Sequence, residues 1–298
     1  MRILLIGADG MLGTDLETVL SGRHEVIAAD LPDIDITDRE NVQDWVAKAT
    51  PHVIVHAAAY TDVEGAEDES ERAFLVNETG TRNVAAAAQE AGASLVYFST
   101  DFVFDGRKAA AYVESDEPNP QGEYAKSKVA GEQQAKLAER HCILRTAWLY
   151  GPRKANFVEK IIFYARQKGR LKVISEEIGS PTYTLDLSMA VAAAIESGMT
   201  GLYHVTNAGS CSRYEFAKEI VKLAGLDNVV VAPATTAEIG MKAARPAFGV
   251  LSNALWESSG GPPLRHWKDA LKSYVNDRRD RWMLLQSANA TREAEKSC

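Results

Sequence analysis

A tyrosine and a lysine one helical turn apart are the residues of this chain best suited to chemistry. They are Tyr124 and Lys128, in the segment Tyr124-Ala-Lys-Ser-Lys128. Residues four apart on a helix lie on one face, so the lysine ammonium can sit beside the phenol. A nearby positive charge favours the ionised phenol and lowers a pKa that is normally ~10. We therefore expect Tyr124 to exchange a proton with a carbonyl or alcohol oxygen near neutral pH.

A glycine-rich segment near the amino terminus suggests what accompanies this proton transfer. Gly7, Gly10 and Gly13 lie between an apolar strand-like run and a helix-like run, the context of a dinucleotide-binding loop. Such glycines permit a tight turn, close approach of a pyrophosphate and close packing of helix on strand. Combined with the tyrosine–lysine pair, the loop indicates hydride transfer with a nicotinamide cofactor. The predicted cofactor site takes in Gly7, Asp9, Gly10, Met11, Leu12 and Gly13.

Residues at the ends of the next two predicted strands extend this cofactor site. Asp30 can accept a hydrogen bond from the 2′-hydroxyl of the adenosine ribose and would repel a 2′-phosphate, which favours NADH over NADPH. Alternatively, Asp30 only caps the strand end. Asp35 and Ile36 can border the adenine, or belong to a solvated loop. The run Ala57-Ala58-Ala59 leaves room for a ribose, although tight packing alone would also explain it. Tyr124 and Lys128 complete the predicted cofactor contacts, because Lys128 can also hold the nicotinamide ribose.

Hydroxyl groups at the end of the fourth predicted strand can act together with Tyr124. The segment Ser99-Thr100-Asp101 ends that strand at the edge where ligands of parallel sheets bind. A second donor on the carbonyl oxygen would stabilise the negative charge that develops as hydride arrives. The residues alone leave Ser99 and Thr100 both open. Asn77 interrupts an apolar helix face, and we favour a structural role for its amide.

Apolar runs alternate with amphipathic segments through the first half of the chain. This alternation predicts an α/β fold with a Rossmann-type, doubly wound parallel sheet. The predicted strands are Ile3–Ile6, Glu25–Ala29, Val53–His56, Leu95–Ser99 and Cys142–Arg145, and the predicted helices are Met11–Ser21, Asp38–Ala49, Glu67–Ala91 and Glu123–Glu139.

The second half is less regular and predicts a smaller, mixed lobe that binds the substrate. We expect a Rossmann domain over residues 1–150 and a substrate lobe over 151–276, with some segments of the lobe returning to the main sheet. Residues 277–298 are polar without a core face, so we expect a flexible tail.

Composition excludes several functional classes. The chain has 298 residues, 46% hydrophobic and 25% charged, with a net charge of −8, which is typical of a soluble globular enzyme. No apolar run approaches the ~20 residues of a membrane span, and no basic stripe suggests nucleic acid. The three cysteines have no metal-ligand spacing, so we predict no metal site and a reducing, cytoplasmic location. A homodimer is the commonest oligomer for such a protein.

With these motifs in view, the chain resembles the extended short-chain dehydrogenases, and more closely the dTDP-4-dehydrorhamnose reductase family. The resemblance spans residues 1 to about 275 and implies NADPH- or NADH-dependent reduction of the 4-keto group of dTDP-4-dehydro-L-rhamnose to dTDP-L-rhamnose. The matching stretches are residues 7–13, 57–61, 76–80, 99–106, 124–128, 145–151, 156–157 and 179–182, with Arg245-Pro246 and Ser252 near the end.

The resemblance also implies roles for single residues. It implies Thr100, Tyr124 and Lys128 as the catalytic set. It places Thr61, Asp101, Phe102 and Trp148 around the sugar, and we add Asn156 from the matched Asn156-Phe157 stretch and Arg245. Without the resemblance, Trp148 would be assigned to the core. Arg245 can pair with the substrate diphosphate or with a carboxylate of the protein.

Two departures from the family pattern keep other functions open. Phe102 and Tyr60 stand where the family usually has tyrosine and histidine, so one hydroxyl that could bind the sugar is missing. A reductase of another keto sugar and a nucleotide-binding regulatory subunit therefore remain alternatives. A nucleotide-sugar 4-epimerase also remains open, because it needs only the same catalytic residues and room for the keto sugar to turn over. A 4,6-dehydratase is disfavoured, because the second carboxylate expected after Thr100-Asp101 is absent.

Overall fold

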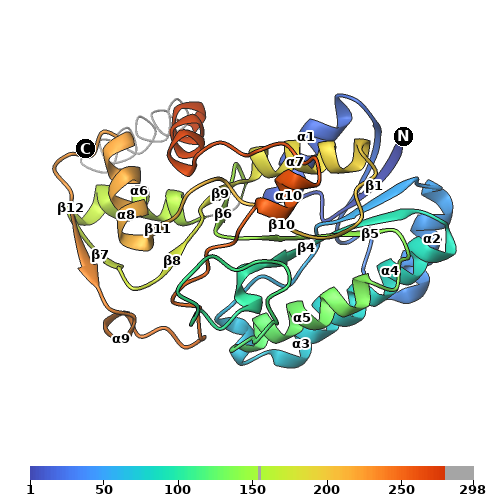
Figure 1. The fold of residues 1–298 in the computed structure, drawn as a ribbon, viewed down its shortest axis with the longest axis horizontal. Helices are drawn as coiled ribbons and strands as arrows, with labels where there is room; N and C mark the ends of the chain where they lie inside the picture. The colour runs from blue at the N-terminus through green and yellow to red at the C-terminus, as the bar shows by residue number, and fades with distance from the viewer. Residues whose placement is uncertain (154–155, 279–298) are drawn as a thin grey trace, which may run out of the picture.

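The computed structural model of the chain describes residues 1–153 and 156–278, and its centre is a six-stranded sheet (Figure 1). The strands lie in the order β10-β5-β4-β3-β1-β2, and every neighbouring pair is parallel. Their bounds are β1 (Arg2–Ile6), β2 (Glu25–Ala29), β3 (Val53–His56), β4 (Ser94–Thr100), β5 (His141–Thr146) and β10 (Gly201–His204).

Helices cover both faces of this sheet, because successive side chains of a strand point to opposite faces. Leu5 packs in the cluster beneath α1 (Met11–Ser21) and α7 (Thr184–Glu196). Its neighbour Leu4 packs on the other side, with α2 (Arg39–Ala49) and α4 (Thr81–Glu90). Figure 1 shows α5 (Glu123–Ala135) beside α4 on that second side. The predicted doubly wound α/β sheet is therefore confirmed.

The segment expected to form one helix over 67–91 is broken into several pieces. A 3-10 turn, η1 (Gly65–Glu67), and α3 (Ser70–Phe74) precede a π-helical stretch, η2 (Leu75–Gly80), before α4 begins. Asn77 lies in that stretch and is 1% exposed. Its side chain bonds the Tyr60 backbone at both N–H and carbonyl and donates to Ser127 Oγ at 2.9 Å. The amide therefore ties the loop after β3 to α5, as its structural interpretation predicts.

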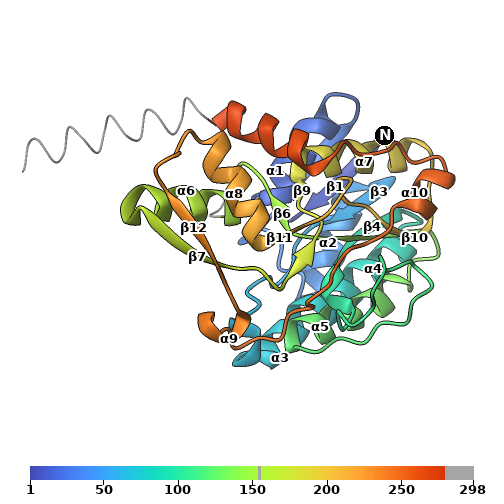
Figure 2. The same ribbon diagram turned by 60° about the vertical axis from the view of Figure 1, so that its left-hand side comes forward.

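A smaller lobe stands at one side of the sheet, with its own core around Tyr150, Phe216 and Tyr274 (Figure 2). Three two-stranded pairs run through it, β6 with β9, β7 with β12 and β8 with β11. The strands are β6 (Leu149–Tyr150), β7 (Arg170–Ile174), β8 (Ile178–Gly179), β9 (Thr182–Tyr183), β11 (Cys211–Ser212) and β12 (Val230–Ala234), and the helices are α6 (Phe157–Lys168), α8 (Arg213–Leu223), α9 (Thr236–Ile239) and a helix that begins at residue 267. The short helix α10 (Ala254–Ser258) lies instead against β10 of the main sheet, with Trp256 in the same core cluster as Leu5.

The chain crosses between the two parts more than once. β10 pairs with β5 of the main sheet, and α7 packs against α1. Both elements come from the range 151–276 that we assign to the substrate lobe, so the lobe is not one continuous stretch of chain. The predicted flexible tail begins too early, because residues 277 and 278 belong to the helix that starts at residue 267, and Arg278 pairs with Glu159 at 3.0 Å. From residue 279 on, the predicted tail lies outside the described residues. Among the helices of the described part, none has the length and apolar character to cross a membrane.

Candidate active site

A cleft of about 690 Å³ opens at the carboxyl ends of the sheet strands, next to the point where strand order reverses between β1 and β3. This is the position where open α/β sheets bind ligands. The cleft brings together nearly all the site residues predicted from the sequence. Of the predicted site residues, only Asp9 and Asn156 do not line it.

The glycine loop forms a closely packed cradle on one side of the cleft. Gly7 has a φ of +88°, and a Cβ there would lie 2.4 Å from the Ala58 backbone nitrogen. A Cβ on Gly13 would lie 2.0 Å from the Gly7 carbonyl oxygen. Any side chain at these positions would therefore displace backbone. The turn leads into the amino end of α1, where free N–H groups and the helix dipole favour a phosphate. These features fit a dinucleotide cofactor.

Asp30 at the end of β2 is linked to that loop by hydrogen bonds. One carboxylate oxygen accepts from the Asp9 backbone nitrogen at 2.8 Å, and the other from the Leu31 backbone nitrogen at 2.8 Å. Asp9 itself points outward and pairs with Arg153 at 2.6 Å. Asp30 therefore lines the cleft and also braces the loop, so its structural role is present, and its contact with the ribose stays a prediction. Asp9 takes part in this contact through its backbone nitrogen, and its side chain does not line the cleft.

Tyr124 at the start of α5 faces Thr100 at the end of β4. The Thr100 hydroxyl donates to Asp101 Oδ1 at 3.0 Å, and the Phe102 ring meets Tyr124 edge-on at a centroid separation of 5.7 Å. Burial, and secondarily Asp101, raises the pKa of Tyr124 to about 12, against a smaller opposite effect of the Thr100 hydroxyl. Ser99 lies beside them, 4% exposed, but it is Thr100 that acts on the phenol.

The expectation that Lys128 lowers the pKa of Tyr124 is wrong for this structure. The Lys128 ammonium donates to the Phe98 carbonyl at 2.7 Å and lies 4.3 Å from the Tyr97 ring centroid. Burial lowers the pKa of Lys128 to about 7, with Glu132 opposing. Sharing a helix face puts the two side chains in one cleft, but the ammonium is bound to the Phe98 carbonyl and Lys128 does not lower the pKa of the phenol. Tyr124 is therefore a protonated acid at neutral pH.

Asp101 is a buried carboxyl group at the base of the cleft, 1% exposed. Burial raises its pKa to about 7, with Thr100 and Arg213 opposing. Its second oxygen, Oδ2, is buried and has no hydrogen-bond partner within the described part of the chain. A buried oxygen without a hydrogen-bond partner destabilises the folded protein, unless a ligand donates a hydrogen bond to it. The orphaned oxygen therefore indicates a polar group of the ligand at this point.

The remaining nominated residues fall into two groups. Trp148 lines the cleft, and Arg245 lines it while pairing with Glu64 at 2.6 Å, so the protein-carboxylate alternative for Arg245 is realised here. Asn156 instead caps α6. Its side chain accepts from the Glu159 backbone and donates to the Gly151 carbonyl at 2.8 Å. Its amide is used within the fold, away from the cleft, and we no longer count it as a substrate contact.

Two arginines near the cleft were missed by sequence reasoning. Arg213 lines the cleft and stacks on Trp148, with its guanidinium carbon 3.5 Å from a ring centroid. Arg153 reaches the cofactor loop through Asp9. Each arrives from an element far away in sequence, and neither belongs to a local motif that could have signalled it.

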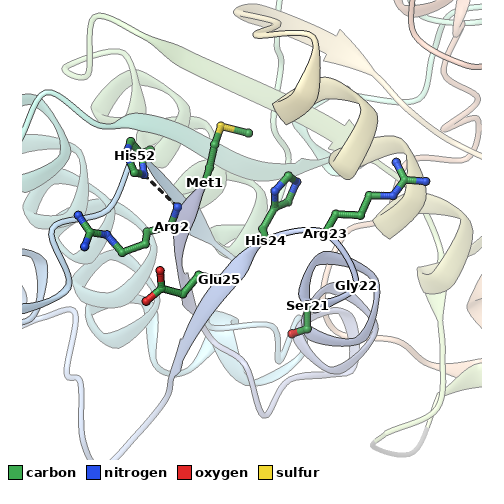
Figure 3. Close-up of a pocket in the computed structure, with 8 residues that line it drawn as sticks. All are labelled: Met1, Arg2, Ser21, Gly22, Arg23, His24, Glu25 and His52. Atoms are coloured by element: carbon green, nitrogen blue, oxygen red, sulfur yellow. Dashed lines mark hydrogen bonds between the residues drawn. The ribbon is translucent and has the colours of Figure 1, made fainter.

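A second hollow lies at the other end of the sheet, where β1 and β2 begin, and it is lined by charged side chains (Figure 3). Figure 3 shows the Arg2 and Arg23 side chains pointing away from each other, and His52 bonded to the Arg2 backbone. The polar groups do not converge on one point, so we assign no site here.

Comparison with known proteins agrees with the geometry. The family model described as RmlD substrate binding domain matches residues 1–279. A dTDP-4-keto-6-deoxy-D-glucose reductase of Streptomyces niveus is 38% identical over 91% of this chain and 95% of its own length. Crystal structures of dTDP-4-dehydrorhamnose reductases from Clostridium acetobutylicum and, in complex with NADP, from Bacillus anthracis are 41% and 39% identical. Both superpose with a TM-score of 0.90 and cover 93% of this chain and 99% of their own.

The match runs through both parts of the fold, from the glycine cradle to the helix that begins at residue 267. This chain belongs to the dTDP-4-dehydrorhamnose reductase family.

Proposed function

We propose that this protein reduces the 4-keto group of dTDP-4-dehydro-L-rhamnose to the alcohol of dTDP-L-rhamnose, using NADH or NADPH. The observation that carries the proposal is that Tyr124 and Thr100 line the same cleft as a glycine cradle suited to a dinucleotide. The two related crystal structures are of proteins named dTDP-4-dehydrorhamnose reductase, and one of them is a complex with NADP.

Tyr124 and Thr100 act on the carbonyl oxygen of the sugar. When bound, the reduced nicotinamide supplies the hydride that the carbonyl carbon accepts. Tyr124 gives its proton to the carbonyl oxygen, and solvent later restores it. Thr100 donates a second hydrogen bond to that oxygen while negative charge develops on it. Because burial keeps the pKa of Tyr124 at about 12, the phenol carries the proton that reduction needs.

In its ammonium form, Lys128 supplies positive charge in the same cleft as this pair. Its ammonium is held by the Phe98 carbonyl and stays in place while the charge on the substrate changes. A fixed cation in a site without bulk water stabilises the phenolate that remains after proton transfer. We also assign it the ribose of the nicotinamide half.

Asp30 supports a preference for NADH within the proposed function. Its carboxylate faces the cleft at the end of β2, where a ribose 2′-hydroxyl would be accepted and a 2′-phosphate repelled. Arg153 lies on the same loop through Asp9 and offers positive charge that would favour NADPH. Asp30 lines the cleft directly and Arg153 does not, so we give Asp30 the larger weight.

The proposed function is tested by following oxidation of NADH, and separately NADPH, at 340 nm with dTDP-4-dehydrorhamnose generated in situ. We expect turnover with both cofactors, faster with NADH, and dTDP-L-rhamnose as the product by mass spectrometry. The absence of turnover by a protein that binds the cofactor would contradict the proposal.

A substitution of Asp30 tests whether this residue sets the preference for NADH over NADPH. Asp30→Ser should lower the rate ratio of NADH to NADPH about tenfold, because a hydrogen bond to a charged group contributes ~1.5–3 kcal/mol. Asp44→Ser removes an exposed carboxylate on α2 and should leave the ratio unchanged. An unchanged ratio in Asp30→Ser would remove Asp30 from the cofactor preference.

The pH dependence follows from Lys128. Its pKa of about 7 means that the ammonium is present below pH 7 and lost as pH rises through that value, while Tyr124 stays protonated to about 12. We therefore expect kcat/KM to fall as pH rises above about 7. Lys128→Arg keeps a charge at every pH and should flatten the profile, whatever its absolute rate. A wild-type profile that stays flat to pH 9 would contradict the role of Lys128.

One observation favours a second substrate. Phe102 puts a ring edge against Tyr124 and offers no hydroxyl to the sugar. The Streptomyces niveus relative is named for dTDP-4-keto-6-deoxy-D-glucose, a keto sugar of different configuration. Assaying that sugar beside dTDP-4-dehydrorhamnose decides between them. A cytoplasmic location and a homodimer stay predictions.

A further inference from the structure

Arg213 is placed in the cleft by elements of the smaller lobe. It begins α8 directly after β11, which pairs antiparallel with β8 so that Ser212 lies opposite Ile178. The Arg213 backbone nitrogen donates to the Glu177 carbonyl at 3.2 Å, which anchors the start of the helix. The side chain then reaches from the lobe into the cleft that Thr100 and Tyr124 also line.

The Arg213 side chain is held on three sides. Its guanidinium carbon lies 3.5 Å from the Trp148 ring centroid and 5.2 Å from that of Phe157. Nε faces Glu177 Oε2 at 3.4 Å. Trp148 is itself tightly placed, because its φ is +48° and a Cβ on Gly179 would lie 2.4 Å from the indole. Arg213 and Trp148 therefore form a preorganised pair.

The terminal nitrogens of Arg213 remain available to a ligand. Within residues 1–153 and 156–278, the only side-chain hydrogen bond of Arg213 is the one from Nε to Glu177. Nη1 and Nη2 are also absent from the buried atoms without partners, so they are open to the cleft. A guanidinium fork offers parallel N–H donors that suit two oxygens at once.

Asp101 presents the complementary acceptor. Its Oδ2 is buried and unpartnered, and it packs against Gly249, where a Cβ would lie 2.6 Å away. Asp101 and Arg213 are close enough to influence each other, since Asp101 raises the pKa of the guanidinium against the effect of burial. The cleft thus offers donors, an acceptor and an aromatic surface together, which suits the hydroxyl groups and apolar face of a sugar ring.

We propose that Arg213 is a specificity residue, which binds a hydroxyl group of the sugar next to the reacting carbonyl while Asp101 accepts from the neighbouring hydroxyl and Trp148 packs on the ring. This inference rests on the proposed function, because it assigns part of the same substrate. A neutral diol fits better than the diphosphate, since Glu177 and Asp101 already face the charge of Arg213.

Binding measurements test this proposal without relying on turnover. By calorimetry, Arg213→Met should weaken binding of dTDP-L-rhamnose roughly tenfold or more and leave dTDP within about twofold. Methionine keeps length and packing on Trp148 while removing the donors. Arg82→Met, an exposed arginine on α4, is the control and should change neither. Equal weakening of dTDP and dTDP-L-rhamnose would assign Arg213 to the diphosphate and overturn the proposal, as would no weakening of either.

Deoxy substrates identify the hydroxyl. With the 3-deoxy analogue of dTDP-4-dehydrorhamnose, which lacks the hydroxyl next to the C4 carbonyl, Arg213→Met should cost less than about twofold in kcat/KM, whereas with the 2-deoxy analogue the loss should match that with the parent sugar. An equal loss with the parent and both analogues would overturn the proposal. Arg213→Lys keeps charge without the fork and should restore only part of the loss; full restoration would overturn the forked contact. Wild-type protein that binds dTDP-L-rhamnose no better than dTDP would instead contradict the proposed function.

Discussion

Replacing Tyr124 by phenylalanine is expected to lower kcat by roughly 10²–10⁴-fold, because the reaction then lacks its general acid. The phenol is the group in the described cleft that faces Thr100 and is held protonated at neutral pH. Phenylalanine keeps the ring and its edge-on contact with Phe102, so packing changes little. Steady-state rates with saturating NADH and keto sugar measure the effect.

Two further measurements make the Tyr124→Phe result specific. Affinity for NADH should stay within about twofold, because the lost hydroxyl serves the sugar oxygen more than the cofactor. Tyr164→Phe removes an exposed phenol on α6 and should keep full activity. Normal turnover by Tyr124→Phe would show that another group delivers the proton, and the mechanism would fail.

Replacing Arg145 by methionine is expected to lower the free energy of unfolding by about 3–5 kcal/mol. Arg145 at the end of β5 and Glu132 on α5 form two parallel hydrogen bonds of 2.8 and 2.7 Å, with side chains 3% and 1% exposed. The substitution would leave the Glu132 carboxylate buried without its partner. Denaturant unfolding at pH 7 measures the loss.

The Arg145–Glu132 pair also positions α5, the helix that carries Tyr124 and Lys128. Glu132 lies one turn after Lys128 on α5, so the ion pair fixes the helix to β5 next to the cleft. The double variant Arg145→Met/Glu132→Leu should recover much of the stability, because no buried charge is then left alone. Arg39→Met breaks an exposed pair with Glu90 and should cost about 0–1 kcal/mol. A loss as small as that in Arg145→Met would mean that the buried pair does not hold α5.

Burial shifts the pKa values of three polar groups in the cleft. Tyr124 and Asp101 are pushed towards their neutral forms by burial, and Lys128 is pushed towards its neutral amine. Such perturbed groups gather at functional sites, because desolvation that is costly for folding prepares them for proton transfer. In this cleft the proposed acid, Tyr124, is therefore protonated before reduction begins.

The sequence by itself determined the fold class and most of the residues that line the cleft. Apolar runs alternating with amphipathic segments predicted the parallel sheet, and the spacing of Gly7, Gly10 and Gly13 predicted the cradle. These are local patterns, in which residues a few positions apart meet because backbone geometry brings them together. The placement of Tyr124 and Lys128 in one cleft was predictable for the same reason.

Only the tertiary structure decided the electrostatics and the distant partners. Sequence spacing put Lys128 near Tyr124, but the Phe98 carbonyl captures the ammonium and burial raises the pKa of the phenol. Asn156 matched a family motif, yet its amide is used to cap α6. Arg213 comes to Trp148 through the pairing of β8 with β11. Desolvation and long-range contacts depend on what the folded chain packs around each group, which no local spacing encodes.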